Sequence, residues 1–155
     1  MSRWLIVSKK QSNITFNISH NNDSYKECLR LFNSLSSKEQ EWLSHGNYKN
    51  SPHLLLKTLA YDGDKLVGFC DAIPYEFTSK DTAFLSICVD KKYRGQGIAS
   101  TLVELMEKEL SKIGYNKCIW KVNSDNISSI KLAEKNNYIH KETEDEDLIF
   151  YKEFK

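Results

Sequence analysis

The residues Val89-Asp-Lys-Lys-Tyr-Arg-Gly-Gln-Gly-Ile-Ala-Ser-Thr-Leu-Val-Glu-Leu-Met106 join a predicted buried strand to a predicted amphipathic helix. The strand, residues 83–89, is uncharged and contains β-branched and aromatic residues. The helix follows two glycines, and its apolar residues recur at the spacing of one helix face: Ile98, Leu102, Met106, Leu110 and Ile113. A strand, a glycine turn and a helix together direct backbone N–H groups and the positive end of a helix dipole toward one point, an arrangement that binds phosphate. Gly97 and Ala99 are small enough to let an anion approach the backbone.

The turn itself, Arg94-Gly95-Gln96-Gly97-Ile98-Ala99, has the pattern R-x-x-G-x-A. This pattern resembles the pyrophosphate-binding signature, Q/R-x-x-G-x-G/A, of the GNAT superfamily of acetyl-CoA-dependent N-acetyltransferases. Two other phosphate-binding motifs do not match. A Walker loop requires Gly-Lys-Ser/Thr where Ile98 follows Gly97, and the dinucleotide fingerprint requires a third glycine where Ser100 stands. The remaining alternative is an ordinary turn that contains two glycines.

Length, charge and cysteine usage restrict the class of protein. The 155 residues predict one domain, residues 1–155, because a chain of this length can bury a single core. The net charge of +1 gives no reason to expect nucleic acid, and no apolar run is long enough to span a membrane. The cysteines form no C-x-x-C pair, so we expect reduced thiols and a cytoplasmic location. No His, Cys and Asp residues have metal-ligand spacing, and the sequence is compatible with both a monomer and a homodimer.

Periodicity along the chain predicts the element order β(β)ααβββαβαββ. A three-strand meander precedes two βα units, which predicts an α/β (α+β) fold with a mixed, mainly antiparallel central sheet flanked by helices on both faces. Ser37 and Gln40 form a capping-box pattern for the second helix, and the acidic residues 142–147 separate the last two strands. The GNAT fold has the same element order.

A second segment, residues 122–138, is similar to the GNAT strand-to-helix pattern V-x-x-x-N-x-x-A-I-x-L-Y-x-K-x-G-F. The resemblance places Asn126 near the pantetheine or phosphate arm of CoA, and Ser129 at the position of the small residue. Asn126 can also serve only as a helix cap, and the two roles are compatible. Ala133 stands where the family has the tyrosine that protonates the departing CoA thiolate. Because a thiol has a pKa of about 8.5, the thiolate leaves near neutral pH with little help.

The resemblance implies a set of cofactor-binding residues on the strand, the turn and the second helix cap. On the strand, backbone groups would pair with pantetheine as if it were an added strand. Cys88 on that strand has apolar neighbours in sequence, so we interpret it as a packing residue and not as a nucleophile. The predicted cofactor-binding residues are Ile87, Cys88, Val89, Arg94, Gly95, Gln96, Gly97, Ile98, Ala99, Ser100, Asn126 and Ser129.

The acceptor side of the predicted site has weaker signals. A primary amine has a pKa near 10.4, so its proton must be removed before attack, and a carboxylate suits that role. Asp71 and Glu76 are the candidate catalytic bases, although either can be an ordinary polar strand residue. His45 and His53 are candidates to line an acceptor pocket, or lie on the surface. Lys121 stands where GNAT enzymes acting on ribosomal peptides have a glutamate, which argues against that branch.

These residues together predict an acyl-CoA-dependent N-acyltransferase. Acetyl-CoA would be its cosubstrate, no metal would be needed, and a primary amine would attack the thioester directly. A backbone N–H near residues 87–89 would stabilise the oxyanion. A non-catalytic CoA-binding or sensing module is the alternative, and a phosphate-binding protein without CoA is a third. Amino acids, polyamines, aminoglycosides and protein termini all stay open as acceptors.

Overall fold

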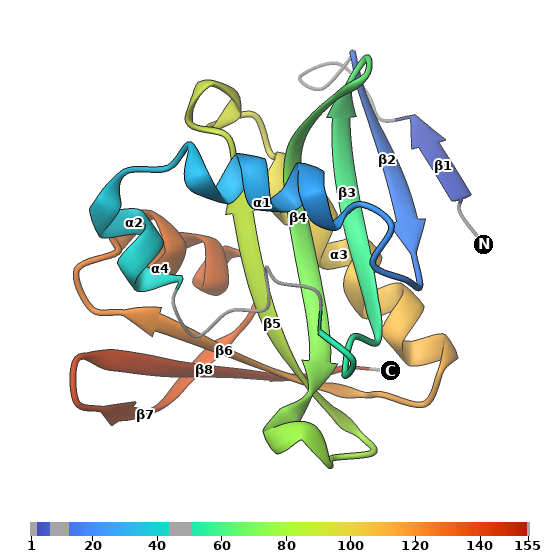
Figure 1. Cartoon of the computed structure of the whole chain (residues 1–155). Helices are drawn as coiled ribbons and strands as arrows, with labels where there is room; N and C mark the ends of the chain where they lie inside the picture. The colour runs from blue at the N-terminus through green and yellow to red at the C-terminus, as the bar shows by residue number, and fades with distance from the viewer. Residues whose placement is uncertain (1–2, 7–12, 44–50, 155) are drawn as a thin grey trace.

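A computed structural model describes residues 3–6, 13–43 and 51–154. An eight-stranded sheet runs through the molecule in the order β1-β2-β3-β4-β5-β6-β8-β7 (Figure 1). Neighbouring strands are antiparallel apart from β5 and β6, which are parallel. The strands are β1 (Arg3–Ile6), β2 (Ile14–Ser19), β3 (Leu56–Asp62), β4 (Lys65–Pro74), β5 (Thr82–Val89), β6 (Lys117–Asn123), β7 (Ile139–Glu144) and β8 (Asp147–Glu153).

Helices cover both faces of the sheet. In Figure 1, α1 and α2 lie in front of it and α3 lies behind it. The helices are α1 (Tyr25–Asn33), α2 (Ser37–Trp42), α3 (Ile98–Lys112) and α4 (Ile127–Lys135), with 3₁₀ turns η2 (Tyr75–Phe77) and η3 (Lys91–Tyr93). This order and the mixed, mainly antiparallel sheet confirm the predicted fold class. Within the described ranges, no helix is long and apolar enough to cross a membrane.

Two groups of buried side chains hold the helices on the sheet. The α3 residues Leu102, Met106 and Leu110 are completely buried in one group, as their spacing predicted. The second group joins α1 to the other face of β3, β4 and β5 through Cys28, Leu31, Phe32, Leu35, Leu59, Leu66, Phe69 and Cys88. Removal of this apolar surface from water is the main force that holds the layers together. The packing fixes β5 between α1 and α3, and β5 leads directly into the glycine turn.

The capping box of α2 forms one residue earlier than predicted. Ser36 is the N-cap, because its backbone is extended, and its hydroxyl accepts a hydrogen bond from the Glu39 N–H at 3.2 Å. The Glu39 side chain accepts in return from the Ser36 N–H at 3.3 Å. The predicted pair, Ser37 and Gln40, is therefore wrong by one position, and the difference brings Glu39 to the first turn of α2.

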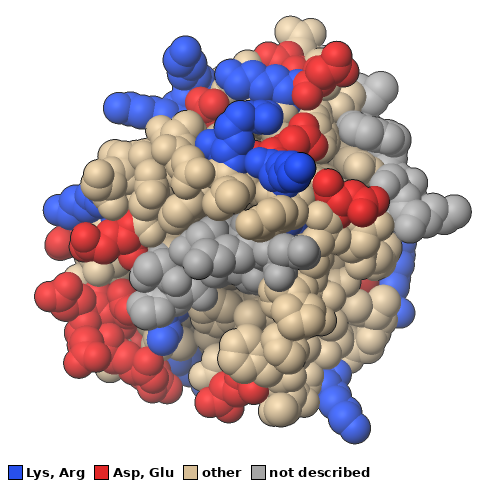
Figure 2. Space-filling view, in the orientation of Figure 1, with Lys and Arg blue, Asp and Glu red and all other residues tan. Residues whose placement is uncertain are grey.

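Ile113 and the acidic residues 142–147 also differ from the prediction. Because α3 ends at Lys112, Ile113 follows the helix, and its side chain is 44% exposed instead of buried. Most of the acidic segment belongs to β7 and β8 and is not a loop. Its carboxylates gather at the lower left of Figure 2, where Figure 1 labels β7. An edge strand tolerates such charges because it is exposed along its whole length.

The strands β5 and β6 separate partway along their length. Their parallel ladder pairs residues 82–85 with residues 117–120 and ends there. The ladder between β5 and β4 continues to Val89, and the ladder between β6 and β8 continues to Asn123. The last part of β5 therefore has an edge that is turned away from β4 and lies outside the β6 ladder.

Candidate functional site

A cavity of about 420 Å³ opens between α2, the end of β5, the glycine turn and the start of α4. All the residues predicted to bind the cofactor line this cavity: Ile87, Cys88, Val89, Arg94, Gly95, Gln96, Gly97, Ile98, Ala99, Ser100, Asn126 and Ser129. They come from three separate segments, which folding brings to one place. Asp71 and Glu76, which the structure also describes, are not among the residues that line it.

The glycine turn has the geometry of an anion site. Gly95 and Gly97 have φ angles of +80° and +84°, in the left-handed region that residues with a side chain rarely adopt. Gly97 is the N-cap of α3, and its carbonyl accepts the first helical hydrogen bond, from the Thr101 N–H at 3.1 Å. The N–H groups of residues 98–100 precede that bond and, as at any helix start, have no intrahelical acceptor. Together with the helix dipole, they fit a phosphate group.

The edge of β5 forms the floor of the cavity beside this turn. Ile87, Cys88 and Val89 line it at the place where β5 continues beyond the ladder with β6. An extended ligand can hydrogen-bond to such an edge as an additional strand. Cys88 is 4% exposed, and burial raises the pKa of its thiol, so the thiolate needed for nucleophilic attack is disfavoured.

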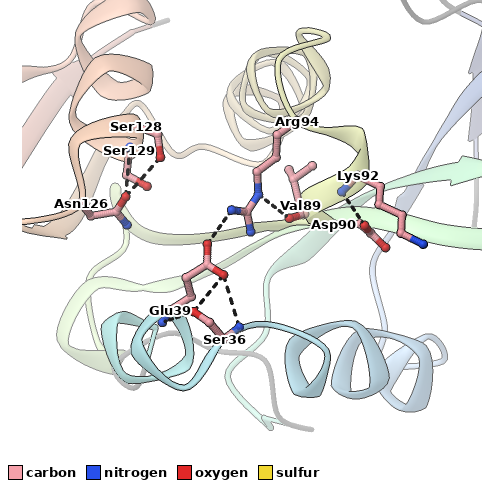
Figure 3. A network of polar contacts seen from close by, with 9 residues as sticks. All are labelled: Ser36, Glu39, Val89, Asp90, Lys92, Arg94, Asn126, Ser128 and Ser129. Carbon is pink, nitrogen blue, oxygen red and sulfur yellow. Dashed lines mark hydrogen bonds and ion pairs between the residues drawn. The ribbon is translucent and has the colours of Figure 1, made fainter.

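Asn126 at the start of α4 forms the opposite wall. Its side-chain oxygen accepts hydrogen bonds from the Ser129 N–H at 3.3 Å and the Ser128 hydroxyl at 3.4 Å (Figure 3). Asn126 therefore caps α4 and also lines the cavity. Lys131 and Lys135 of the same helix line it as well and add positive charge.

Sequence reasoning missed the wall that the first two helices contribute. Its apolar residues are Leu35, Trp42 and Leu43. Its polar residue is Glu39, which accepts a hydrogen bond from Arg94 of the glycine turn (Figure 3). The sequence does carry a signal for Glu39, because Ser36 followed three residues later by Glu39 is itself a capping-box pattern. No spacing rule, however, connects two residues 55 positions apart.

The two predicted bases occupy different places. Asp71 on β4 is completely buried, opposite Lys57 of β3 and opposite Ser86 of β5. Its carboxylate accepts no hydrogen bond within the described part of the chain. Burial raises the pKa of Asp71 to about 8, against the opposing effect of the Lys57 charge. Glu76 is exposed in η2 with a φ of +54°. Neither carboxylate lines the cavity. Asp71 is nevertheless close to the point where β5 and β6 separate, because its partner on β5, Ser86, directly follows Leu85, the last β5 residue that pairs with β6.

The position where GNAT enzymes have a tyrosine is occupied here by alanine, and a different tyrosine lines the cavity. Ala133, at the position of the family tyrosine, is completely buried in the core. Tyr138 follows the same helix, but its hydroxyl donates to Glu107 at 2.8 Å and it does not line the cavity. Tyr93 does line the cavity, and its hydroxyl donates to Asp62 at 2.6 Å. That hydrogen bond raises the pKa of Tyr93. Among the tyrosines that the structure describes, Tyr93 lines this cavity and Tyr138 does not.

Of the two histidines named from the sequence, the structure describes His53. The ring of His53 contacts Phe77, with ring centroids 4.8 Å apart, and His53 is not among the lining residues. His45 lies outside the described residues. In the part of the chain that the structure describes, no three His, Cys, Asp or Glu side chains gather as a metal site requires.

The chain belongs to the acetyltransferase (GNAT) family, because the sequence model of that family matches residues 19–138. A comparison with curated protein sequences found no match. Among solved structures, the GNAT domain of S. lividans PAT is similar with a TM-score of 0.79 and 14% identity, over 99% of this chain and 97% of that one. The PaiA N-acetyltransferase of Thermoplasma acidophilum, in complex with coenzyme A, has a TM-score of 0.71 and 17% identity, over 90% and 99%. The ribosomal-protein-S18-alanine N-acetyltransferase of Escherichia coli has a TM-score of 0.67 and 19% identity, over 90% and 94%.

Proposed function

We propose that this protein transfers an acetyl group from acetyl-CoA to a primary amine. The observation that carries the proposal is that every residue that the GNAT motifs assign to the cofactor lines the cavity at the glycine turn. Membership of the acetyltransferase (GNAT) family supports the reaction class. The similar fold of PaiA, solved with coenzyme A, supports the choice of cosubstrate.

The residues around the cavity match the parts of CoA in charge and shape. The N–H groups of residues 98–100 would bind the pyrophosphate, and Lys131 and Lys135 would attract the phosphates. The edge of β5 at residues 87–89, which lies outside the β6 ladder, would pair with the two amides of pantetheine. The thioester would then lie near the separation of β5 and β6.

The acetyl group would pass directly from CoA to the amine, without a covalent enzyme intermediate. The amine nitrogen bonds to the thioester carbon, the carbon–sulfur bond breaks, and CoA leaves as a thiolate. A backbone N–H of β5 would stabilise the negative charge that develops on the carbonyl oxygen. The buried thiol of Cys88 is not needed as a nucleophile.

For the proton of the amine, we assign Asp71 as the first candidate base and Glu76 as the second. Asp71 lies opposite Ser86, at the level where β5 leaves β6, which is the expected level of the thioester. Burial raises the pKa of Asp71 to about 8, so the carboxylate form that can accept a proton becomes populated as the pH rises toward that value. The unpaired state of all four cysteines supports the expectation of a reducing, cytoplasmic location.

Incubation of the protein with acetyl-CoA and a panel of amines tests the proposal. The panel contains amino acids, polyamines, aminoglycosides and peptide N-termini, with thiol release and the product mass as readouts. Acetylation of any amine class supports the transferase. Binding of acetyl-CoA without transfer to any amine favours a CoA-sensing module, and absence of binding overturns both.

A further inference from the structure

Arg94 of the glycine turn is held from two sides. Its Nε donates a hydrogen bond to the Val89 carbonyl at 3.0 Å, and its Nη1 donates to Glu39 Oε2 at 2.5 Å. Figure 3 shows the guanidinium between the end of β5 and α2. The Arg94 side chain is 37% exposed and that of Glu39 is 24% exposed. The ion pair thus connects the predicted phosphate site to a helix of the opposite wall.

The capping box of α2 orients the Glu39 side chain toward Arg94. Its second carboxylate oxygen, Oε1, accepts from the Ser36 N–H at 3.3 Å and from the Ser36 hydroxyl at 3.2 Å. The other oxygen, Oε2, accepts the hydrogen bond from Arg94. Burial alone would raise the pKa of Glu39, but the hydrogen bond and charge of Arg94 and the Ser36 cap outweigh it and lower the pKa below its usual value. Glu39 is therefore ionised at neutral pH.

Glu39 places a negative charge beside a site built for an anion. Both Glu39 and Arg94 line the cavity at the glycine turn. Resting on the function proposed above, we infer that Glu39 and the pyrophosphate of CoA exchange at Arg94, so that Glu39 determines the affinity for pyrophosphate-bearing acyl donors. The exchange is favoured because two like charges that share one cation repel each other, and the backbone N–H groups of the turn add their attraction to the pyrophosphate.

The exchange couples the cofactor to α2. Trp42 on α2 and Leu43 at its C-terminal cap line the same cavity as Glu39. When the pyrophosphate displaces Glu39, the ion pair that holds α2 against the glycine turn is lost. Because coupling between two sites is reciprocal, a ligand that stabilises α2 in its present position also weakens CoA binding.

The charge-removing variant Glu39→Gln tests the exchange, since glutamine can keep the capping box. We expect Glu39→Gln to bind CoA and dephospho-CoA about two- to fivefold more tightly, the range set by a partly exposed ion pair. Pantetheine, which has no phosphate, should bind both proteins equally. Glu41→Gln on the same helix is the matched control, because Glu41 is exposed, and it should leave all affinities unchanged.

Two further variants make the result decisive. Glu39→Ala removes the charge and the side-chain half of the capping box, and it should also tighten CoA binding. In an Arg94→Gln background, the effect of Glu39→Gln should shrink, because the shared cation is absent. Unchanged or weaker CoA binding by both Glu39 variants would mean that Glu39 supports Arg94 and does not compete for it, which overturns the exchange. Failure of every protein, wild type included, to bind CoA would instead refute the proposed function.

Discussion

Lys57 on β3 lies directly opposite Asp71 on β4, and both side chains are completely buried. The pair lies beneath α1, where the Lys57 ammonium is 3.7 Å from the Cys28 sulfur. Burial raises the pKa of Asp71 from its usual 3.8 to about 8, because removal from water costs the carboxylate more than the charge of Lys57 returns. The folded protein therefore keeps Asp71 largely protonated at pH 7.

The first prediction concerns stability and pH. Between about pH 4 and pH 8, the unfolded Asp71 carboxyl is ionised while the folded one is protonated. The folded state then binds more protons, so the contribution of Asp71 to the free energy of unfolding falls as pH rises through this window. Asp71→Asn imitates the neutral acid and should remove this slope. Urea unfolding of both proteins at a series of pH values measures the difference, and identical pH slopes would contradict the raised pKa.

The second prediction concerns the base. We expect Asp71→Asn to lower kcat/KM by about 100-fold or more on an identified amine, the usual contribution of a general base. Glu76→Gln, an exposed substitution, should have a smaller effect. Steady-state kinetics with thermal melting as the folding control measures both. If both variants keep the wild-type kcat/KM, neither carboxylate is the base and the proton leaves through water.

The third prediction concerns the glycine turn. Gly97→Val should weaken acetyl-CoA binding by about tenfold or more, because the φ of +84° is strained with a side chain and a valine blocks the pyrophosphate. Gly114→Val is the matched control at the other end of α3. Gly114 has a φ of +96° and open space where a Cβ would stand, so the variant has similar backbone strain away from the cavity. Calorimetry that gives equal affinities for Gly97→Val and Gly114→Val would rule out a phosphate site at the turn.

The fourth prediction concerns the missing family tyrosine. With alanine at position 133, no phenol there can ionise near pH 10, so kcat/KM should rise with pH as the amine loses its proton and then reach a plateau. Tyr138→Phe should leave this profile unchanged, because the Tyr138 hydroxyl is committed to Glu107. It should lower stability by about 1–3 kcal/mol through loss of that hydrogen bond.

A reversible fall in rate near pH 9–10 would show that another group supplies the proton. Tyr93 would then be mutated first, because it lines the cavity. Loss of the falling limb in Tyr93→Phe, together with a decrease in rate of more than about tenfold, would mean that the acid has moved to this residue.

The sequence alone predicted the residues that line the cavity at the glycine turn. A phosphate site needs consecutive backbone N–H groups at a helix start, so residues 94–100 carry the whole signal in one short segment. The resemblance to the GNAT family added residues 87–89 of β5, and a local capping pattern identified Asn126 as a helix start. For this reason every predicted cofactor residue lines the cavity.

The wall that α2 contributes to the cavity and the surroundings of Asp71 were decided only by the tertiary structure. The contact between Glu39 and Arg94 joins residues 55 positions apart, and it depends on where α1 and α2 pack on the sheet. The burial of Asp71 beside Lys57 depends in the same way on the register of β3 and β4. Charge and hydrogen-bonding type can be read from a residue's identity, but burial and pKa are set by the elements stacked above it. The sequence alone therefore suggested Asp71 as a base, but only the fold showed that its carboxyl is buried and separate from the cavity.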